Sequence, residues 1–439
     1  MDIAVVKPGQ RAQGTITVPG DKSISHRVAM MAALASGTSL ISGFLHAEDC
    51  LNTLKALGAL GATIEFPGDT HRITGGKWHV RKNPLVMGNS GTGLRLMAGL
   101  LAGRPWTSEL TGDESLRSRP MERIKEPLEK MGARLELTGN KGCAPIRITG
   151  GKLRAIDYEM PVASAQVKSC VLLAALFADG VTNVIEKKPT RDHTEQIFRR
   201  MGIPLIIEGD RISVRGFGAS GPALEPIVCE IPGDFSSAAF WLAAACAKPG
   251  SRIIVRQVGL NPRRTGLLDV LRRMGAQISV VADENAKLLE PCGTVSAEGG
   301  RLQATTVGGA EIPNIIDELP LVAVLGALAQ GITVISGARE LRVKESDRIA
   351  VMAANLRLLG VELEEKEDGL IINGGGRLRG EVTVDSFGDH RVAMAMAIMA
   401  LYAESPVTIR NIACVATSYP EFWNNLRRIG ADVGISYCD

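Results

Sequence analysis

The chain has 439 residues, of which 45% are hydrophobic and only 4% are aromatic, and its formal net charge at pH 7 is +3. This length predicts two or three domains, each with a core built mainly from aliphatic side chains. The charge is close to neutral and no block of like charges occurs, which argues against a nucleic-acid-binding protein.

At the N-terminus we find neither a basic leader nor a long apolar segment, and the longest apolar run, 392–403, is too short to span a membrane. The eight cysteines are scattered, and none has a Cys or His partner at zinc spacing. We therefore expect a cytoplasmic protein with reduced thiols, no metal site and no membrane partner.

The first predicted elements are a strand that ends at Val18, a Pro-Gly break and a helix capped by Asp21 or Ser23. Lys22, Ser23 and Arg27 lie in or near the first turn of this helix. Free backbone N–H groups and the positive end of the helix dipole bind anions at such a place. An ordinary capped helix with two surface cations is the alternative interpretation of this stretch alone.

One pattern then recurs six times along the chain: an amphipathic helix ends in glycine and a β-rich strand follows. The glycines are Gly61, Gly132, Gly202, Gly275, Gly360 and Gly430. Their spacings are 71, 70, 73, 85 and 70 residues, which indicates an internal repeat. Each glycine lies where a helix needs a left-handed residue before the chain enters a strand.

A second type of helix precedes each of these glycines and is small, Ala-rich and apolar nearly all round, which predicts burial. These helices start near 21–23, 89–93, 163–166, 233–237, 316–318 and 388–391. The amphipathic helices are charged on one face and should lie outside them. Each unit therefore reads helix, strand, helix, strand, strand.

Six such units predict an α/β (α+β) fold with two domains of three units, in which sheets surround buried helices. We expect 20–231 to form an inserted domain, and 1–19 with 232–439 to form a second domain completed by the N-terminal strands. Both crossings between them carry Pro-Gly followed by Asp. A hinge is therefore predicted near 18–21 and 229–234.

If the buried helices start at a cleft between the domains, their positive ends attract anions there. Cations gather at these starts and in three loops, namely Lys22, Arg27, Arg95, Arg119, Arg191, Lys344, Arg348 and Arg391. Taken singly each is consistent with a solvated loop, but together they favour an anionic ligand. Ser23, Ser164 and Gln166 can donate hydrogen bonds to it or act as helix caps.

Two acids lie among these cations. Asp317 stands near the start of a buried helix and Glu345 lies beside Lys344 and Arg348. Asp317 also fits an N-cap, whereas an acid within a cationic site is a candidate general base. Walker, dinucleotide-binding and Ser–His–Asp patterns are not found, so no nucleotide cofactor is expected.

Several of these segments carry a family resemblance, namely Pro19–Arg27, Gly88–Thr92, Arg119–Met121, Ser164–Ser169, Arg342–Arg348 and Gly388–Arg391. Over nearly its whole length the chain resembles the enolpyruvyl transferases, in the branch that acts on shikimate 3-phosphate. The resemblance implies two domains of three similar units. It also implies transfer of the enolpyruvyl group of phosphoenolpyruvate to the 5-hydroxyl of shikimate 3-phosphate in aromatic amino acid biosynthesis, with phosphate released and no metal or cofactor.

The same resemblance implies roles for individual residues. The implied contacts to shikimate 3-phosphate are Lys22, Ser23, Arg27, Ser164, Ala165, Gln166, Arg191, Asp317 and Lys344. Those to phosphoenolpyruvate are Lys22, Gly91, Arg119, Gln166, Arg348 and Arg391. Asp317 and Glu345 are implied as the proton-transfer pair, with Lys22 between both substrates, and we expect a monomer.

Two alternatives remain open. A UDP-N-acetylglucosamine enolpyruvyl transferase typically has Lys-Asn after the first crossover and a reactive cysteine in the loop of Arg119. Here Lys22 is followed by Ser23 and no cysteine lies between 51 and 142. A non-catalytic protein that binds phosphorylated metabolites is the other alternative. One departure is that 414–420 lacks the lysine found there in many relatives.

Overall fold

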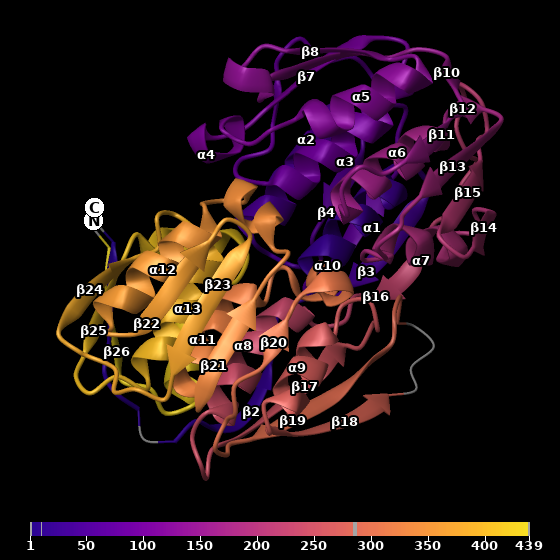
Figure 1. The fold of residues 1–439 in the computed structure, drawn as a ribbon. Helices are drawn as coiled ribbons and strands as arrows, with labels where there is room; N and C mark the ends of the chain where they lie inside the picture. The colour runs from indigo at the N-terminus through magenta and orange to yellow at the C-terminus, as the bar shows by residue number, and fades with distance from the viewer. Residues whose placement is uncertain (1, 10, 284–287, 438–439) are drawn as a thin grey trace. The chain divides into compact units, whose positions relative to one another are not determined.

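The computed structural model describes residues 2–9, 11–283 and 288–437. Contacts divide the described residues into two compact units. We call the first the inserted unit; it comprises 20–231 and 288–290. We call the second the flanking unit; it comprises 2–19, 232–283 and 291–437. Each unit is described by itself (Figure 1).

The described residues form six four-stranded sheets that share one pattern, in which the first two strands are parallel and the others antiparallel. Those of the inserted unit have the orders β16-β3-β5-β4, β6-β7-β9-β8 and β11-β13-β15-β14. Their strands are β16 (Val228–Glu230), β3 (Thr38–Ser42), β5 (Thr70–Thr74), β4 (Thr63–Glu65), β6 (Leu85–Val86), β7 (Thr107–Thr111), β9 (Ile146–Thr149), β8 (Arg134–Leu137), β11 (Asp157–Glu159), β13 (Val181–Ile185), β15 (Arg211–Arg215) and β14 (Leu205–Glu208). A further two-stranded sheet pairs β10 (Leu153–Arg154) with β12 (Ala178–Asp179).

The flanking unit has the sheet orders β2-β17-β19-β18, β20-β21-β23-β22 and β24-β25-β1-β26. Their strands are β2 (Gln13–Thr17), β17 (Arg252–Gly259), β19 (Cys292–Glu298), β18 (Gln277–Asp283), β20 (Thr306–Val307), β21 (Gly331–Ile335), β23 (Gly369–Gly374), β22 (Glu362–Lys366), β24 (Val382–Asp385), β25 (Val407–Arg410), β1 (Ile3–Val6) and β26 (Val433–Ser436). The two N-terminal strands therefore pair within two of these sheets, β1 between β25 and β26 and β2 beside β17.

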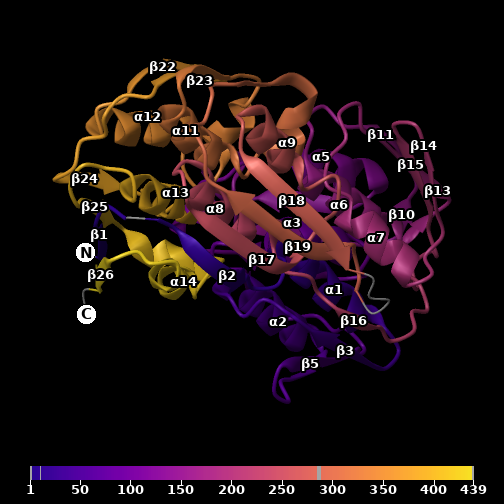
Figure 2. The ribbon, with the colours of Figure 1, turned by 90° about the horizontal axis from the view of Figure 1, so that it is seen from below.

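Helices accompany the sheets in each unit, as Figures 1 and 2 show. The inserted unit has α1 (Lys22–Leu34), α2 (Glu48–Leu60), α3 (Gly91–Ala102), α4 (Glu114–Arg117), α5 (Glu122–Met131), η1 (Asn140–Gly142), α6 (Ala165–Ala175) and α7 (His193–Arg200). The flanking unit has α8 (Phe235–Cys246), α9 (Gly266–Arg273), η2 (Gly309–Glu311), α10 (Ile312–Ile315), α11 (Leu319–Leu328), η3 (Arg339–Val343), α12 (Arg348–Leu358), α13 (His390–Ala400), η4 (Ile412–Thr417) and α14 (Phe422–Arg428).

The buried helices are α1, α3 and α6 in the inserted unit and α8, α11 and α13 in the flanking unit, and their apolar side chains form the two cores. Amphipathic helices such as α5 and α9 keep charged residues in their last turns. The predicted fold class, with six repeats of buried helices and surrounding sheets, is confirmed.

The six repeat glycines have the left-handed backbone that the sequence pattern predicts. Their φ angles are positive, from 72° at Gly202 to 124° at Gly61. A residue with a β-carbon would be strained at such angles, so glycine is needed at the point where each outer helix gives way to a strand.

Side-chain caps start five of the six buried helices. Asp21 caps α1, where its Oδ1 accepts a hydrogen bond from the amide of Ile24 at 2.9 Å. The helix α11 differs: Glu318 occupies the N-cap position, no side chain caps the helix, and a proline stands in its first turn. The interpretation of Asp317 as an N-cap is therefore wrong, because the helix begins two residues later, at Leu319.

Residues 288–290 lie between β18 and β19 in the sequence but belong to the inserted unit. There the amide of Leu289 donates to the carbonyl oxygen of Glu230 at 3.2 Å. Nδ1 of His193 lies 2.6 Å from Oε1 of Glu290, and both side chains are buried. The domain boundaries expected from the sequence did not assign this segment to the inserted unit, because its contacts join residues far apart in the chain.

Candidate active site

The start of α1 presents two cations with different surroundings. Nζ of Lys22 lies 3.0 Å from Oδ2 of Asp49, and 16% of the Lys22 side chain is exposed. Arg27 is buried: its Nε donates to Oγ1 of Thr194 at 2.8 Å and its Nη2 to Oγ of Ser169 at 2.7 Å. Lys22 can therefore meet a ligand directly, while the guanidinium of Arg27 is held by α6 and α7.

Burial is the main cause that lowers the pKa of Arg27, to about 10. The carboxylates of Glu195, Asp21 and Glu290 oppose this shift, and the charge of Arg191 adds to it. Arg27 thus stays protonated at neutral pH. The electrostatic effect of Arg191 also shows that the sequence-predicted cations Arg27 and Arg191 act on one another.

Gly91, Arg119 and Gln166 come together around the start of α3. A β-carbon on Gly91 would lie 3.2 Å from Nη1 of Arg119 and 3.0 Å from Nη1 of Arg95. Arg95 in turn donates from Nη1 to Oε1 of Gln166 at 2.5 Å. Arg119 itself is buried, with only 5% of it exposed, whereas its neighbours Arg117 and Ser118 are exposed.

Three further residues hold the polar side chains of this group. Nε2 of Gln166 donates to Oγ1 of Thr92 at 2.9 Å. Nη2 of Arg119 donates to Oγ of Ser115 at 3.1 Å and also to Oδ1 of Asn89. Ser115 carries no signal in the sequence, since an isolated hydroxyl residue near a helix start is common, whereas Thr92 belongs to the segment Gly88–Thr92 that carries the family resemblance.

At the start of α6, Oγ of Ser164 accepts from the amide of Val167 at 3.4 Å, and Ala165 is the first helical residue. Ser164, Ala165 and Arg191 are half-buried. Arg191 lies in the connection from β13 to α7. The inserted unit therefore gathers every residue predicted from its part of the chain around the starts of α1, α3 and α6.

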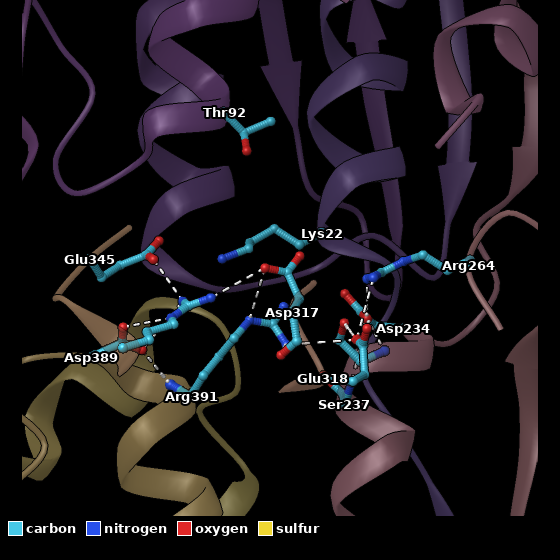
Figure 3. A network of polar contacts seen from close by, with 12 residues as sticks. Lys22, Thr92, Asp234, Ser237, Arg264, Asp317, Glu318, Glu345, Asp389 and Arg391 are labelled. Atoms are coloured by element: carbon cyan, nitrogen blue, oxygen red, sulfur yellow. Dashed lines mark hydrogen bonds and ion pairs between the residues drawn. The ribbon is translucent and has the colours of Figure 1, made fainter. Parts of the chain in front are cut away.

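In the flanking unit, Arg348 links the two predicted acids, Asp317 and Glu345, which are labelled in Figure 3. Its Nη2 donates to Oε2 of Glu345 at 2.6 Å, and its Nη1 to Oδ1 of Asp317 at 3.3 Å. Its Nε donates to Oδ2 of Asp389 at 2.8 Å. One buried guanidinium therefore fixes the relative position of three carboxylates, of which Asp389 was not predicted.

The charges in this cluster compensate one another. Burial alone would lower the pKa of Arg348, but the carboxylates of Asp389, Glu345 and Asp317 outweigh it and raise the pKa above its ordinary value. Only 1% of the Arg348 side chain is exposed. A charge in this position needs such partners, because an unpaired buried cation is costly.

Arg391 reaches Asp317 from α13. Its Nε lies 3.7 Å from Oδ1 of Asp317, and its Nη1 donates to the carbonyl oxygen of the same residue at 3.1 Å. Nη1 of Arg391 is also 3.9 Å from Oε1 of Glu318. Asp317 therefore lies between the guanidinium groups of Arg348 and Arg391. Lys344, which precedes Glu345 in the chain, is half-buried.

Across residues 2–9, 11–283 and 288–437, no group of three or more His, Cys, Asp or Glu side chains is arranged to hold a metal ion. None of the helices among these residues has the length and apolar character needed to cross a membrane.

Comparison with known proteins places this arrangement in a family. The sequence profile of EPSP synthase (3-phosphoshikimate 1-carboxyvinyltransferase) matches residues 6–426. A 3-phosphoshikimate 1-carboxyvinyltransferase of Akkermansia muciniphila is 48% identical over 427 residues, which cover 94% of this chain and 97% of that protein. One of Methylococcus capsulatus is 48% identical over 434 residues, with 98% of each chain covered.

Solved structures agree with the sequence relatives. EPSP synthase from Acinetobacter baumannii superposes with a TM-score of 0.86 at 41% identity, with both chains covered completely. The enolpyruvyl transferase NikO from Streptomyces tendae has a TM-score of 0.79 at 19% identity and covers 100% of this chain and 99% of its own, which shows a shared fold. The chain therefore belongs to the EPSP synthase family of 3-phosphoshikimate 1-carboxyvinyltransferases.

Proposed function

We propose that this enzyme transfers the enolpyruvyl group of phosphoenolpyruvate to the 5-hydroxyl of shikimate 3-phosphate by addition and elimination. The observation that carries the proposal is the Arg348 cluster. It presents the two acids Asp317 and Glu345 on one buried cation, with Arg391 beside them. UDP-N-acetylglucosamine as acceptor is not favoured, since the relatives compared above bear the name 3-phosphoshikimate 1-carboxyvinyltransferase.

Substrate binding is proposed to use both units. Contacts to shikimate 3-phosphate come from Lys22, Ser23, Arg27, Ser164, Ala165, Gln166 and Arg191 of the inserted unit and from Asp317 and Lys344 of the flanking unit. Contacts to phosphoenolpyruvate come from Lys22, Gly91, Arg119, Gln166, Arg348 and Arg391. The half-buried state of Lys22 and Ser164 supports these roles, because part of each residue remains accessible to a ligand.

The proposed cations outnumber the negative charges of the two substrates. Each substrate carries one phosphate, with a charge of roughly −1.5 to −2, and one carboxylate, so that the pair brings about −5 to −6. Seven cations would face them, namely Lys22, Arg27, Arg119, Arg191, Lys344, Arg348 and Arg391. Cations directed at the departing phosphate stabilise the negative charge that develops as its bond breaks.

The chemistry needs three proton transfers, which two groups can perform. The substrate hydroxyl adds to C2 of phosphoenolpyruvate while C3 gains a proton, and the tetrahedral intermediate then loses phosphate and a C3 proton. One group must therefore give and take the C3 proton, and a second must handle the proton of the hydroxyl. Asp317 and Glu345 are proposed for these two tasks, and Lys22 for stabilising charge on both substrates.

Location and assembly are part of the same proposal. The seven described cysteines are free, and six are buried, which fits the reducing conditions of the cytoplasm. The proposed contacts all come from one chain, which is consistent with activity as a monomer.

Release of phosphate from phosphoenolpyruvate tests the proposal. With shikimate 3-phosphate present, phosphate should appear in proportion to the acceptor consumed, and with UDP-N-acetylglucosamine it should not. Release with the sugar nucleotide alone would overturn the proposed acceptor. A protein that binds shikimate 3-phosphate but never releases phosphate would favour the non-catalytic alternative.

A further inference from the structure

The loop that carries Arg191 is held from inside the protein. This loop connects β13 to α7. Oε2 of Glu186 accepts two hydrogen bonds from Thr190, one from the amide at 3.2 Å and one from the hydroxyl at 2.8 Å. Thr190 and Glu186 are both buried. The residue immediately before Arg191 is therefore fixed to the beginning of the loop.

Lys168 joins this loop to the helix that follows it. Its side chain is fully buried, with Nζ 3.0 Å from Oε2 of Glu186 and 2.7 Å from Oε1 of Glu195. Nζ also lies 3.5 Å from the carbonyl oxygen of Thr190. Glu186 precedes the loop and Glu195 lies in the first turn of α7. One ammonium group on α6 thus contacts both ends of the Arg191 loop.

The neighbours of these residues hold Arg27. Ser169 follows Lys168 on α6, and Thr194 precedes Glu195 on α7. Their hydroxyls accept from Arg27 at 2.7 Å and 2.8 Å, and they are themselves joined by a hydrogen bond of 2.7 Å. Two of the four cations of the proposed shikimate 3-phosphate site, Arg27 and Arg191, are therefore anchored through α6 and the first turn of α7.

An ion cluster is an unusual way to hold a loop. Apolar side chains of similar volume would stabilise the packing of α6 on α7 at least as well, because burying charges costs desolvation energy. The charged cluster differs from an apolar contact because its hydrogen bonds have a defined geometry. The carboxylates and the ammonium group therefore fix the backbone of the loop in one position.

We propose that Lys168, Glu186 and Glu195 are positioning residues for the acceptor substrate. They hold Arg191 and Arg27 in the geometry that binds the anionic groups of shikimate 3-phosphate and do not themselves touch it. This inference rests on the proposed function. The cluster lies wholly in the inserted unit and contains none of the residues assigned to phosphoenolpyruvate alone, so its loss should affect one substrate only.

Steady-state kinetics of Lys168→Met and Thr190→Val test the proposal. Thr190→Val keeps the shape of the side chain and removes only the hydroxyl donor to Glu186. We expect KM for shikimate 3-phosphate to rise about tenfold in each variant, with kcat and KM for phosphoenolpyruvate within about twofold of the parent, as for loss of one buried hydrogen bond or ion pair. Calorimetric titration with shikimate 3-phosphate should show the same loss of affinity.

Thr182→Val is the matched control. Thr182 is fully buried on β13, in the strand that leads into the loop, and its hydroxyl has no hydrogen-bond partner among the described residues. This variant should leave both KM values unchanged. A merely structural role for the cluster would lower the active fraction, and hence kcat, without raising KM for one substrate.

Three results would overturn the inference: an unchanged KM for shikimate 3-phosphate, equal increases in both KM values, or a loss confined to kcat. If Lys168→Met does not fold, Thr190→Val decides alone, since it leaves the ion pairs intact. Failure of the proposed function can be told apart from failure of this inference. If the proposed function is wrong, the parent protein itself releases no phosphate in response to shikimate 3-phosphate.

Discussion

Nη2 of Arg348, the first residue of α12, lies 2.6 Å from Oε2 of Glu345, three residues earlier in the chain. The same guanidinium reaches Asp317 at 3.3 Å. Both acids proposed for proton transfer are therefore held by one buried cation, which also belongs to the proposed phosphoenolpyruvate site. A change in the position of the bound phosphate would therefore alter the surroundings of both carboxylates through the guanidinium of Arg348.

Replacing Asp317 should stop catalysis without unfolding the protein. In Asp317→Ala we expect kcat to fall by roughly 10²- to 10⁴-fold, because a positioned proton-transfer group is lost. Phosphate release measures kcat, and circular dichroism checks the fold. Asp269→Ala is the control, since Asp269 is exposed on α9 and pairs there with Arg272. Near-normal turnover in Asp317→Ala would remove this residue from the mechanism.

A side chain at position 91 should weaken binding of phosphoenolpyruvate. The added β-carbon of Gly91→Ala would stand 3.0 Å from Arg95 and 3.2 Å from Arg119, so that one guanidinium must move. We expect KM for phosphoenolpyruvate to rise about tenfold, the order expected from overpacking of 1–3 kcal/mol.

The control for this variant is Gly151→Ala. No atom lies within 4 Å of a β-carbon at Gly151, which is also in the inserted unit. This control should keep both KM values of the parent. If KM for phosphoenolpyruvate is the same in Gly91→Ala and the parent, Gly91 does not shape that site.

Much of this arrangement could be predicted from local sequence. The repeat glycines identify the ends of the outer helices because only glycine readily adopts the left-handed backbone there, and Asp21, Ser164 and Asp389 cap helices as their side chains suggest. These features depend on residues a few positions apart, so the sequence itself contains the pattern.

The long-range polar contacts could not be predicted in the same way. Arg348 forms a hydrogen bond with Asp389, which lies 41 positions later in the sequence. Lys168 contacts Glu186 and Glu195, although the sequence of its helix is apolar apart from this one charge. A lysine in such a helix is indistinguishable in sequence from a solvated one. Only the packing of α6 beside α7 shows that its charge is buried and paired.

The stability of the protein should depend on pH through His26. This side chain is buried between Oγ1 of Thr53, at 2.8 Å from Nδ1, and Oγ of Ser90, at 3.3 Å from Nε2. Burial, followed by the charges of Lys22 and Arg27, lowers the pKa of His26 well below its ordinary value.

The sign of the effect follows from proton binding. Below about pH 6.5 the unfolded chain takes up a proton at His26 that the folded protein does not, so the free energy of unfolding falls as pH drops, by at most about 1.4 kcal/mol per pH unit. Chemical denaturation of the parent and of His26→Gln between about pH 7.5 and about pH 5.5, one unit above and one unit below the ordinary histidine pKa, measures this dependence. The difference between the two proteins should be constant above pH 7 and shrink below pH 6.5. Parallel curves over the whole range would contradict the prediction.

Substrate binding should draw the two units together about a hinge near 18–21 and 229–234. Cations of both units are proposed to bind the same anions, and neutralising them removes the repulsion between like charges. Small-angle scattering should therefore give a smaller radius of gyration with shikimate 3-phosphate than without it. Shikimate without its phosphate should have a weaker effect. Identical scattering with and without the phosphorylated ligand would argue against closure.

The central claim is that this chain forms a carbon–oxygen bond between its two substrates. Phosphoenolpyruvate labelled with ¹³C at C2, incubated with the enzyme and shikimate 3-phosphate, tests it directly by NMR. The account predicts an enolpyruvyl ether at the 5-oxygen and one equivalent of inorganic phosphate. Formation of labelled pyruvate and phosphate without the ether, or no consumption of phosphoenolpyruvate, would contradict it.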